Sequence, residues 1–317
     1  MFQFHDAKKS AKTLLKKEFW KLVLFSFAAE AISVACFLAA FGINRLMMKF
    51  HWQLPYRGHE YTLLPRIVEM IIINISSYHA IRMNAVKFVL IPASLQIVGE
   101  LVCCYAGITI LSWAQFSLTK YINELHNAGQ KIGLSKCVTK KSLKTAVYYS
   151  IKLCKYLLPG AILFLVLFVF SRVSALVWWH TLSGFNTFNV IVTCIVLAVM
   201  SIIFYLRYIL MAAVAATAPD TASEKQLATD SAQAVSGNIA QLILLRLSFI
   251  GWDILGTAAN QIFKLLGSAA VIFFMATRSI YITGIVIGLV LSAFVCAIRD
   301  SYISISLYNT WKETNQT

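Results

Sequence analysis

Long apolar stretches separated by polar segments dominate the chain. Six of them are close to the roughly 20 residues that a helix needs to cross the hydrocarbon core of a bilayer. They cover residues 22–43, 88–111, 157–179, 190–212, 239–258 and 280–298. This pattern predicts an all-α fold, a polytopic membrane helix bundle with about six transmembrane helices in a single membrane domain over residues 1–317.

The segments between the spans differ in length and character. We interpret residues 44–87 as a long outer loop and residues 112–156 as a basic cytoplasmic loop. The segment 259–279 holds an apolar stretch at 262–276 that is short for a crossing, so we interpret it as an outer or re-entrant segment. The alternative counts this stretch as a seventh span and places the C-terminus outside.

Residues 1–21 carry a helical pattern of their own. Alanines and leucines fall on one face of a helix and lysines on the other, as in a helix lying on an anionic leaflet. The apolar face consists of Ala7, Ala11, Leu14 and Leu15. We therefore predict a basic interfacial helix before the first span.

Composition and charge support the membrane assignment. Charged residues make up 13% of the chain, against roughly 25% in soluble domains, which is too few to cover a water-facing surface of this size. The 28 Lys and Arg exceed the 13 Asp and Glu, and the lysines cluster beside apolar segments, so we expect a membrane surface and no nucleic acid as partner.

The distribution of Lys and Arg also predicts the orientation. The segments assigned to the inside hold 17 of these residues and those assigned to the outside hold eight. We therefore expect both termini in the cytoplasm, the protein in the cell membrane and anionic lipids at the cytoplasmic face.

Several short motifs follow one another along the chain. They are the basic N-terminal pattern through Trp20, Tyr205-Leu206-Arg207-Tyr208, Pro219-Asp220, Ser231, Gly237-Asn238, Leu247-Ser248-Phe249-Ile250-Gly251-Trp252 and Leu255-Gly256. In this order the chain resembles the bacterial integral membrane family called domain of unknown function 975, found largely in Gram-positive bacteria. The resemblance implies a polytopic fold with no established activity. Asp253 departs from the family pattern, which usually has an apolar residue there.

Six ionisable residues lie within or at the ends of the predicted spans. A charge at the bilayer centre costs roughly 2.5–3.5 kcal/mol, so it turns inward and finds a partner. Arg207, near the inner end of its span, is expected to snorkel to the interface. Arg246 and Asp253 share a helical face, and we expect them to bond to neighbouring helices rather than to one another. The six residues are Glu30, Glu100, Arg172, Arg207, Arg246 and Asp253.

Glu30 and Glu100 support two interpretations. Each lies near the middle of its span, and two inward carboxylates at similar depth suit a proton relay or a cation site. Alternatively they pair with Arg172 or Arg246 and fix the positions of the helices.

The last predicted span carries small residues at every fourth position. Such a stripe lets a second helix approach closely, either within this chain or in a homodimer. The stripe consists of Gly284, Gly288, Ser292 and Cys296.

Metal chemistry is the least favoured hypothesis. Four histidines fall in the predicted outer segments, but none has the H-x-x-x-H or H-E-x-x-H spacing of metal ligands: His51, His59, His79 and His180. We therefore expect no cofactor and a non-enzymatic membrane accessory or scaffold for lipids, envelope factors or a transport complex. The alternatives are a small proton- or cation-coupled transporter using Glu30 and Glu100, and an oxygenase-like membrane metalloenzyme using the histidines.

Overall fold

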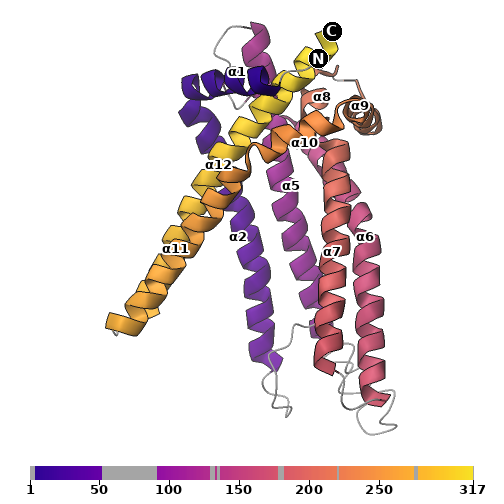
Figure 1. Ribbon diagram of the computed structural model, residues 1–317, viewed down its shortest axis with the longest axis vertical. Helices are drawn as coiled ribbons and strands as arrows, with labels where there is room; N and C mark the ends of the chain where they lie inside the picture. The colour runs from indigo at the N-terminus through magenta and orange to yellow at the C-terminus, as the bar shows by residue number, and fades with distance from the viewer. Residues whose placement is uncertain are drawn as a thin grey trace. The chain divides into compact units, whose positions relative to one another are not determined.

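Helices are the only regular secondary structure among the residues that the structure describes (Figure 1). The computed structural model describes residues 4–51, 91–128, 133, 136–177, 182–219, 221–274 and 278–316. The helices are α1 (Phe4–Lys17), α2 (Phe19–His51), α5 (Ile91–Ala128), α6 (Lys140–Val177), α7 (Leu182–Tyr208), α8 (Met211–Thr217), α9 (Glu224–Ser236), α10 (Ile239–Leu247), α11 (Ile250–Phe274) and α12 (Arg278–Gln316).

Five segments within these helices have the length and apolar composition of membrane spans. They are Phe19–Ala40, Val98–Asn127, Ile191–Thr217, Ile239–Phe263 and Thr283–Glu313. Between 17% and 39% of each segment is buried inside the protein, so most of its apolar surface is exposed. A helix that is apolar on every side is stable only within a protein core or in contact with lipid. The prediction of an all-α polytopic membrane bundle is confirmed.

The chain divides into two compact units. The first comprises Met1–Ser33, Thr109–Ser150 and Tyr205–Thr317, and the second comprises Val34–Ile108 and Ile151–Phe204. In the second unit α6 and α7 are in close contact, because Gly160 has no side chain: a Cβ atom there would lie 2.5 Å from Leu197 Cδ2. Nearby, the rings of Tyr156 and Phe204 meet edge to face with centroids 5.3 Å apart.

The C-terminal half of α12 is the centre of the first unit. All ten residues from 301 to 310 are buried, well beyond residue 298, where the last predicted span ends. Ile305 and Tyr308 belong to the hydrophobic core, and the Tyr308 hydroxyl donates a hydrogen bond of 2.8 Å to Asn123 Oδ1 on α5. The helix is longer than the apolar stretch because its polar residues find partners inside the unit.

The apolar face of α1 is covered by α12. Ala7 and Ala11 are fully buried, and the two helices are in direct contact. Side chains of α12 add two hydrogen bonds to the backbone of α1: Tyr302 Oη donates to Lys8 O at 3.1 Å and Asn309 Nδ2 donates to Ala7 O at 3.3 Å. The sequence pattern predicted that this face enters an anionic leaflet, whereas Ala7 and Ala11 pack against protein instead.

The predicted basic loop at 112–156 is largely helical. The helix α5 continues to Ala128 and α6 already begins at Lys140. Phe116, Tyr121 and Ile122 are buried, so this part of α5 belongs to the core of the first unit. Lysines dominate the hydropathy of this stretch, and they conceal the apolar face that folds inward.

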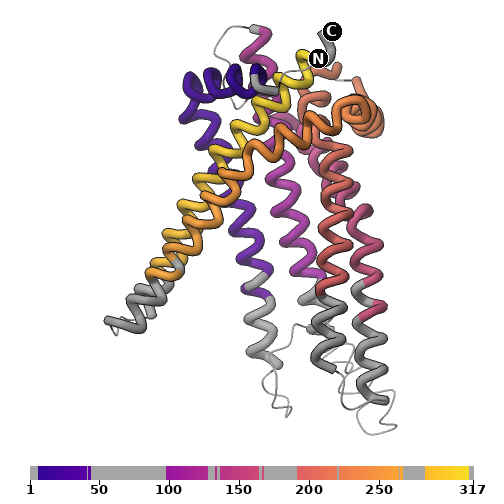
Figure 2. The backbone as a smooth tube through the Cα atoms, in the orientation of Figure 1, coloured from indigo at the N-terminus to yellow at the C-terminus, as the bar shows by residue number. Residues whose placement is uncertain are grey.

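The fifth predicted span also differs from the structure. A bend at Ser248 and Phe249 ends α10 and starts α11, so residues 239–258 are not one continuous helix. The apolar stretch at 262–276 is not a separate re-entrant segment: up to Phe274 it continues α11, which runs alongside α12 (Figures 1 and 2). The physical reason is the close approach of α12, which Gly256 of α11 and Gly288 of α12 permit because neither carries a side chain.

Candidate functional site

The bend between α10 and α11 (Leu247–Ile250) is held by hydrogen bonds and ring contacts within the first unit. The Ser248 hydroxyl donates to Leu245 O at 2.6 Å and so bonds to the open end of α10. Phe249 is fully buried, and its ring meets that of Tyr302 edge to face at 4.8 Å. The motif that carries the family resemblance, residues 247–252, is therefore the bend itself and the first turn of α11.

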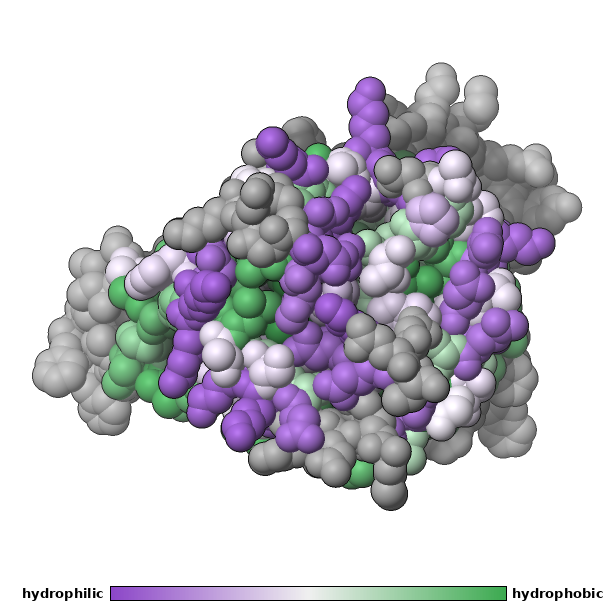
Figure 3. Space-filling model, turned by 90° about the horizontal axis from the view of Figure 1, so that it is seen from above, coloured by the Kyte–Doolittle hydropathy of each residue, from purple (hydrophilic) through white to green (hydrophobic). Residues whose placement is uncertain are grey.

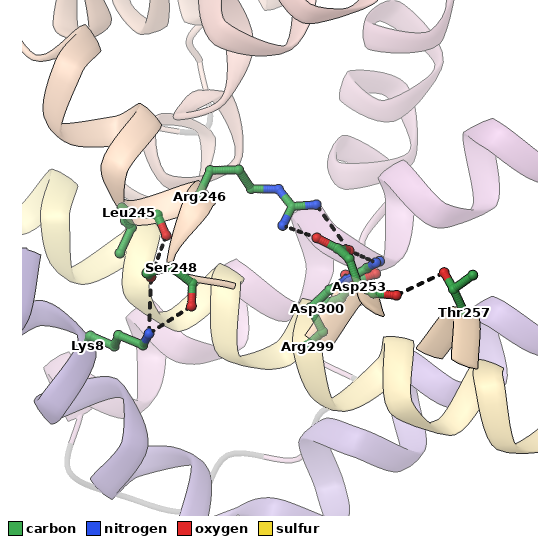
Figure 4. Close-up of polar contacts among 8 residues, drawn as sticks. All are labelled: Lys8, Leu245, Arg246, Ser248, Asp253, Thr257, Arg299 and Asp300. Carbon is green, nitrogen blue, oxygen red and sulfur yellow. Dashed lines mark hydrogen bonds and ion pairs between the residues drawn. The ribbon is translucent and has the colours of Figure 1, made fainter. Parts of the chain in front are cut away.

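Lys8 of α1 bonds to this bend. Its ammonium donates to the carbonyl and to the hydroxyl of Ser248, both at 3.1 Å, and it lies 4.8 Å from the centre of the Phe249 ring (Figure 4). Carbonyl groups at a helix C-terminus carry partial negative charge, which favours a cation there. Burial lowers the pKa of Lys8 from its ordinary value.

Charged residues of α10, α11 and α12 meet just beyond the bend. Arg246 bonds to Asp253 through both amino groups, at 2.9 and 3.4 Å. Arg299 donates to Asp253 at 2.5 Å and to Asp300 at 2.7 Å (Figure 4). The expectation that Arg246 and Asp253 do not bond to one another is wrong, because the long arginine side chain reaches across the bend to the acid two turns later.

Glu30 joins this group from α2. Its carboxyl group lies within hydrogen-bond reach of Asp300 and near the charge of Arg299. A hydrogen bond between two carboxyl groups needs a proton on one of them. We call Glu30, Arg246, Asp253, Arg299 and Asp300 the charge network. The network holds three acids and two arginines, so a hydrogen bond between the carboxyl groups of Glu30 and Asp300 would balance its charges.

Tyr205 extends the network toward the end of α7, because its hydroxyl accepts a hydrogen bond from Arg246.

The other predicted charges lie outside the charge network. Arg207 is exposed, with its guanidinium 6.0 Å from the centre of the Tyr208 ring. Glu100 lies on α5 in the second unit, near Cys104. Arg172 lies on α6, and its side chain is outside the described part. Three of the six predicted charges are thus brought together.

Sequence reasoning missed Arg299 and Asp300. It placed them at the cytoplasmic end of a span that stopped at residue 298. The available signal was the sequence after them: Ile303, Ile305 and Leu307 continue the apolar pattern and are buried. A charged pair with apolar residues on both sides indicates charges inside a packed helix, not at its end.

The predicted stripe of small residues faces α11. A Cβ atom on Gly288 would lie 3.1 Å from Asn260 O and from Phe263 Cβ. One on Gly256 of α11 would lie 3.4 Å from Cys296 Sγ and 3.9 Å from Ser292 O. The two helices therefore approach closely along this stripe, and the contact lies within one chain.

Only one of the four predicted histidine ligands belongs to the described residues. His51 ends α2, whereas His59, His79 and His180 lie outside the described residues, as does most of the predicted loop 44–87. Within the described ranges, no group of three His, Cys, Asp or Glu residues could hold a metal ion.

Comparison with known proteins adds no further information on the site. No family model matches the chain, and neither a curated protein nor a solved structure matches it.

Proposed function

We propose that the protein is a non-enzymatic accessory or scaffold of a bacterial cytoplasmic membrane, serving lipids, envelope factors or a transport complex. The proposal places it in the family that its motifs resemble, with both termini in the cytoplasm. One observation carries it: five charged residues from four helices of the first unit contact one another in the charge network. Such charges fix a structure rather than serve a passing substrate.

The network joins several helices at one point. Asp253 of α11 bonds to Arg246 of α10 and to Arg299 of α12, and Asp300 brings in Glu30 of α2. Removing one partner of such a group leaves an uncompensated charge in a region of low dielectric, which is costly. The arrangement therefore supports a rigid body that presents surfaces to other molecules.

The Glu30–Asp300 contact favours a second candidate function. Carboxyl groups in contact within the helices of a membrane protein are typical of the proton relays of transporters. If the protein is such a transporter, Asp300 rather than Glu100 is the partner of Glu30 within the first unit.

The Glu30→Gln variant separates the two functions, with Glu100→Gln as a control of the same chemistry outside the charge network. For a scaffold, we expect Glu30→Gln to unfold at nearly the same midpoint as the wild type and the control in detergent, because its amide can still donate a hydrogen bond to Asp300. Proteoliposomes of the wild type should then show no proton movement above empty vesicles under an imposed potential. A stable Glu30→Gln variant that abolishes a proton flux seen in the wild type would establish the transporter instead.

A further inference from the structure

The first unit has a cavity on its lysine-rich side that the charge network does not use. Its volume is about 670 Å³, and α5, α6 and the segment before α9 line it. Its lining residues are Lys120, Thr139, Lys140, Lys141, Lys144, Thr221, Ala222, Ser223 and Glu224. We call it the lysine pocket. Figure 3 shows many hydrophilic side chains, with apolar ones between them, on the face that it draws.

Positive charge dominates the lysine pocket. Four of its residues are lysines and one is a glutamate, which leaves an excess of three positive charges. Glu224 forms an ion pair with Lys144 at 3.3 Å, and Lys141 donates to Pro219 O at 2.7 Å. A hydrogen bond from its own backbone and the ion pair with Lys144 lower the pKa of Glu224. The glutamate is therefore ionised at neutral pH and still offsets only one lysine.

Two helices begin at the walls of this pocket. Thr139 caps α6 by accepting from the Ser142 backbone N–H at 3.2 Å, and Ser223 caps α9 by accepting from Gln226 N–H at 3.3 Å. The N-terminus of a helix carries partial positive charge, so both helices add to the field of the lysines.

We propose that the lysine pocket binds a phosphate-bearing anion, supplied either by a lipid headgroup or by a soluble phosphate compound. Lysine ammonium groups are established phosphate ligands, and several of them around one cavity match a group with more than one negative charge. The volume lies in the range of small-molecule sites, which is roughly 300–1,000 Å³. The pocket is separate from the charge network, so the proposal holds for a scaffold and for a transporter alike.

The test measures binding to the purified full chain in neutral detergent. The probes are dihexanoyl phosphatidic acid and pyrophosphate, with dihexanoyl phosphatidylcholine as the zwitterionic reference. The double variant Lys120→Gln/Lys140→Gln keeps the Lys144–Glu224 ion pair, and Lys16→Gln/Lys17→Gln removes the same charge from the exposed face of α1. We expect the first variant to bind about tenfold more weakly or worse and the second to bind as the wild type does.

A variant that is expected to strengthen binding distinguishes a loss of charge from misfolding. Glu224→Gln removes the one negative charge from the lining and should tighten binding, which no loss of structure can imitate. Binding of phosphatidic acid but not of pyrophosphate would identify a lipid headgroup, and binding of pyrophosphate but not of phosphatidic acid would identify a soluble phosphate compound. Mutual displacement would show that the pocket accepts the phosphate group from either source. Absence of binding by both probes, or equal weakening by the two lysine pairs, would overturn the proposal.

Discussion

Asp253 accepts hydrogen bonds from two arginines that come from different helices. Arg246 lies before the bend and Arg299 lies on α12, and the side chains of all three residues are between a fifth and a third exposed. Water or headgroups therefore screen the charges in part. Each carboxylate oxygen of Asp253 has an arginine partner, which makes this residue the centre of the network.

Replacing Asp253 with asparagine should destabilise the first unit. The substitution keeps the size of the side chain but leaves Arg246 and Arg299 with less than their compensating charge. We expect the free energy of unfolding to fall by about 1–3 kcal/mol, less than for a fully buried pair, because the site is partly exposed. The measurement is denaturant unfolding in detergent, followed by helix content.

The double variant Asp253→Asn/Arg246→Gln restores the charge balance and should recover part of the loss. Asp230→Asn on α9, which has no bond to the charge network, is the control and should unfold as the wild type does. An Asp253→Asn variant as stable as the control would show that the network contributes nothing to folding.

The sequence predicted three of the five members of the charge network. Glu30, Arg246 and Asp253 could be found because a charge in an apolar stretch needs a partner. The pairing of Arg246 with Asp253 could not be predicted, because it depends on the bend at Ser248, and contacts of this bend such as the one with Lys8 join residues 240 positions apart. Arg299 and Asp300 were hidden for another reason: hydropathy ends a helix where its apolar stretch ends, whereas α12 continues as a packed helix.

The contact between α11 and α12 depends on the absence of a side chain at Gly288. Gly288→Leu places a large group against Asn260 and Phe263 and should cost about 1–3 kcal/mol of stability through overpacking. The same substitution at Gly251, where a Cβ atom would meet nothing within 4 Å, should leave stability nearly unchanged. The midpoint of thermal unfolding in detergent measures both, and equal loss in the two variants would mean that the contact is not tight.

The attachment of α1 to the bend is a second property at the scale of elements. Lys8→Met keeps the apolar stem of the side chain but removes two hydrogen bonds to Ser248 and the cation above Phe249. We expect a loss of about 1–2 kcal/mol and faster proteolysis of α1. Lys9→Met, at an exposed neighbouring position, should behave as the wild type in both assays. An identical response of the two variants would show that Lys8 does not attach α1 to the bend.

At the scale of the whole molecule, direct contact between the two ends of the chain constrains the topology. Asn309 donates a hydrogen bond to the carbonyl group of Ala7, so both residues lie on the same side of the membrane. A chain that returns to its starting side crosses an even number of times. The five apolar segments found among the described residues are an odd number. We therefore predict a sixth crossing in α6, within the span that the sequence pattern predicts at 157–179.

Cysteine labelling tests this topology in intact cells. In a variant without native cysteines, we expect Lys9→Cys and Thr314→Cys to react with an impermeant thiol reagent only after the membrane is opened. Lys131→Cys in the predicted cytoplasmic segment should behave in the same way, whereas Tyr56→Cys in the predicted outer loop should react at once. The lysine excess around the inner segments is the reason for this orientation. External labelling of Thr314→Cys with internal Lys9→Cys would mean an odd number of crossings, which the contact of Asn309 with α1 does not allow. External labelling of Lys9→Cys, Lys131→Cys and Thr314→Cys together would keep the six crossings and reverse the orientation.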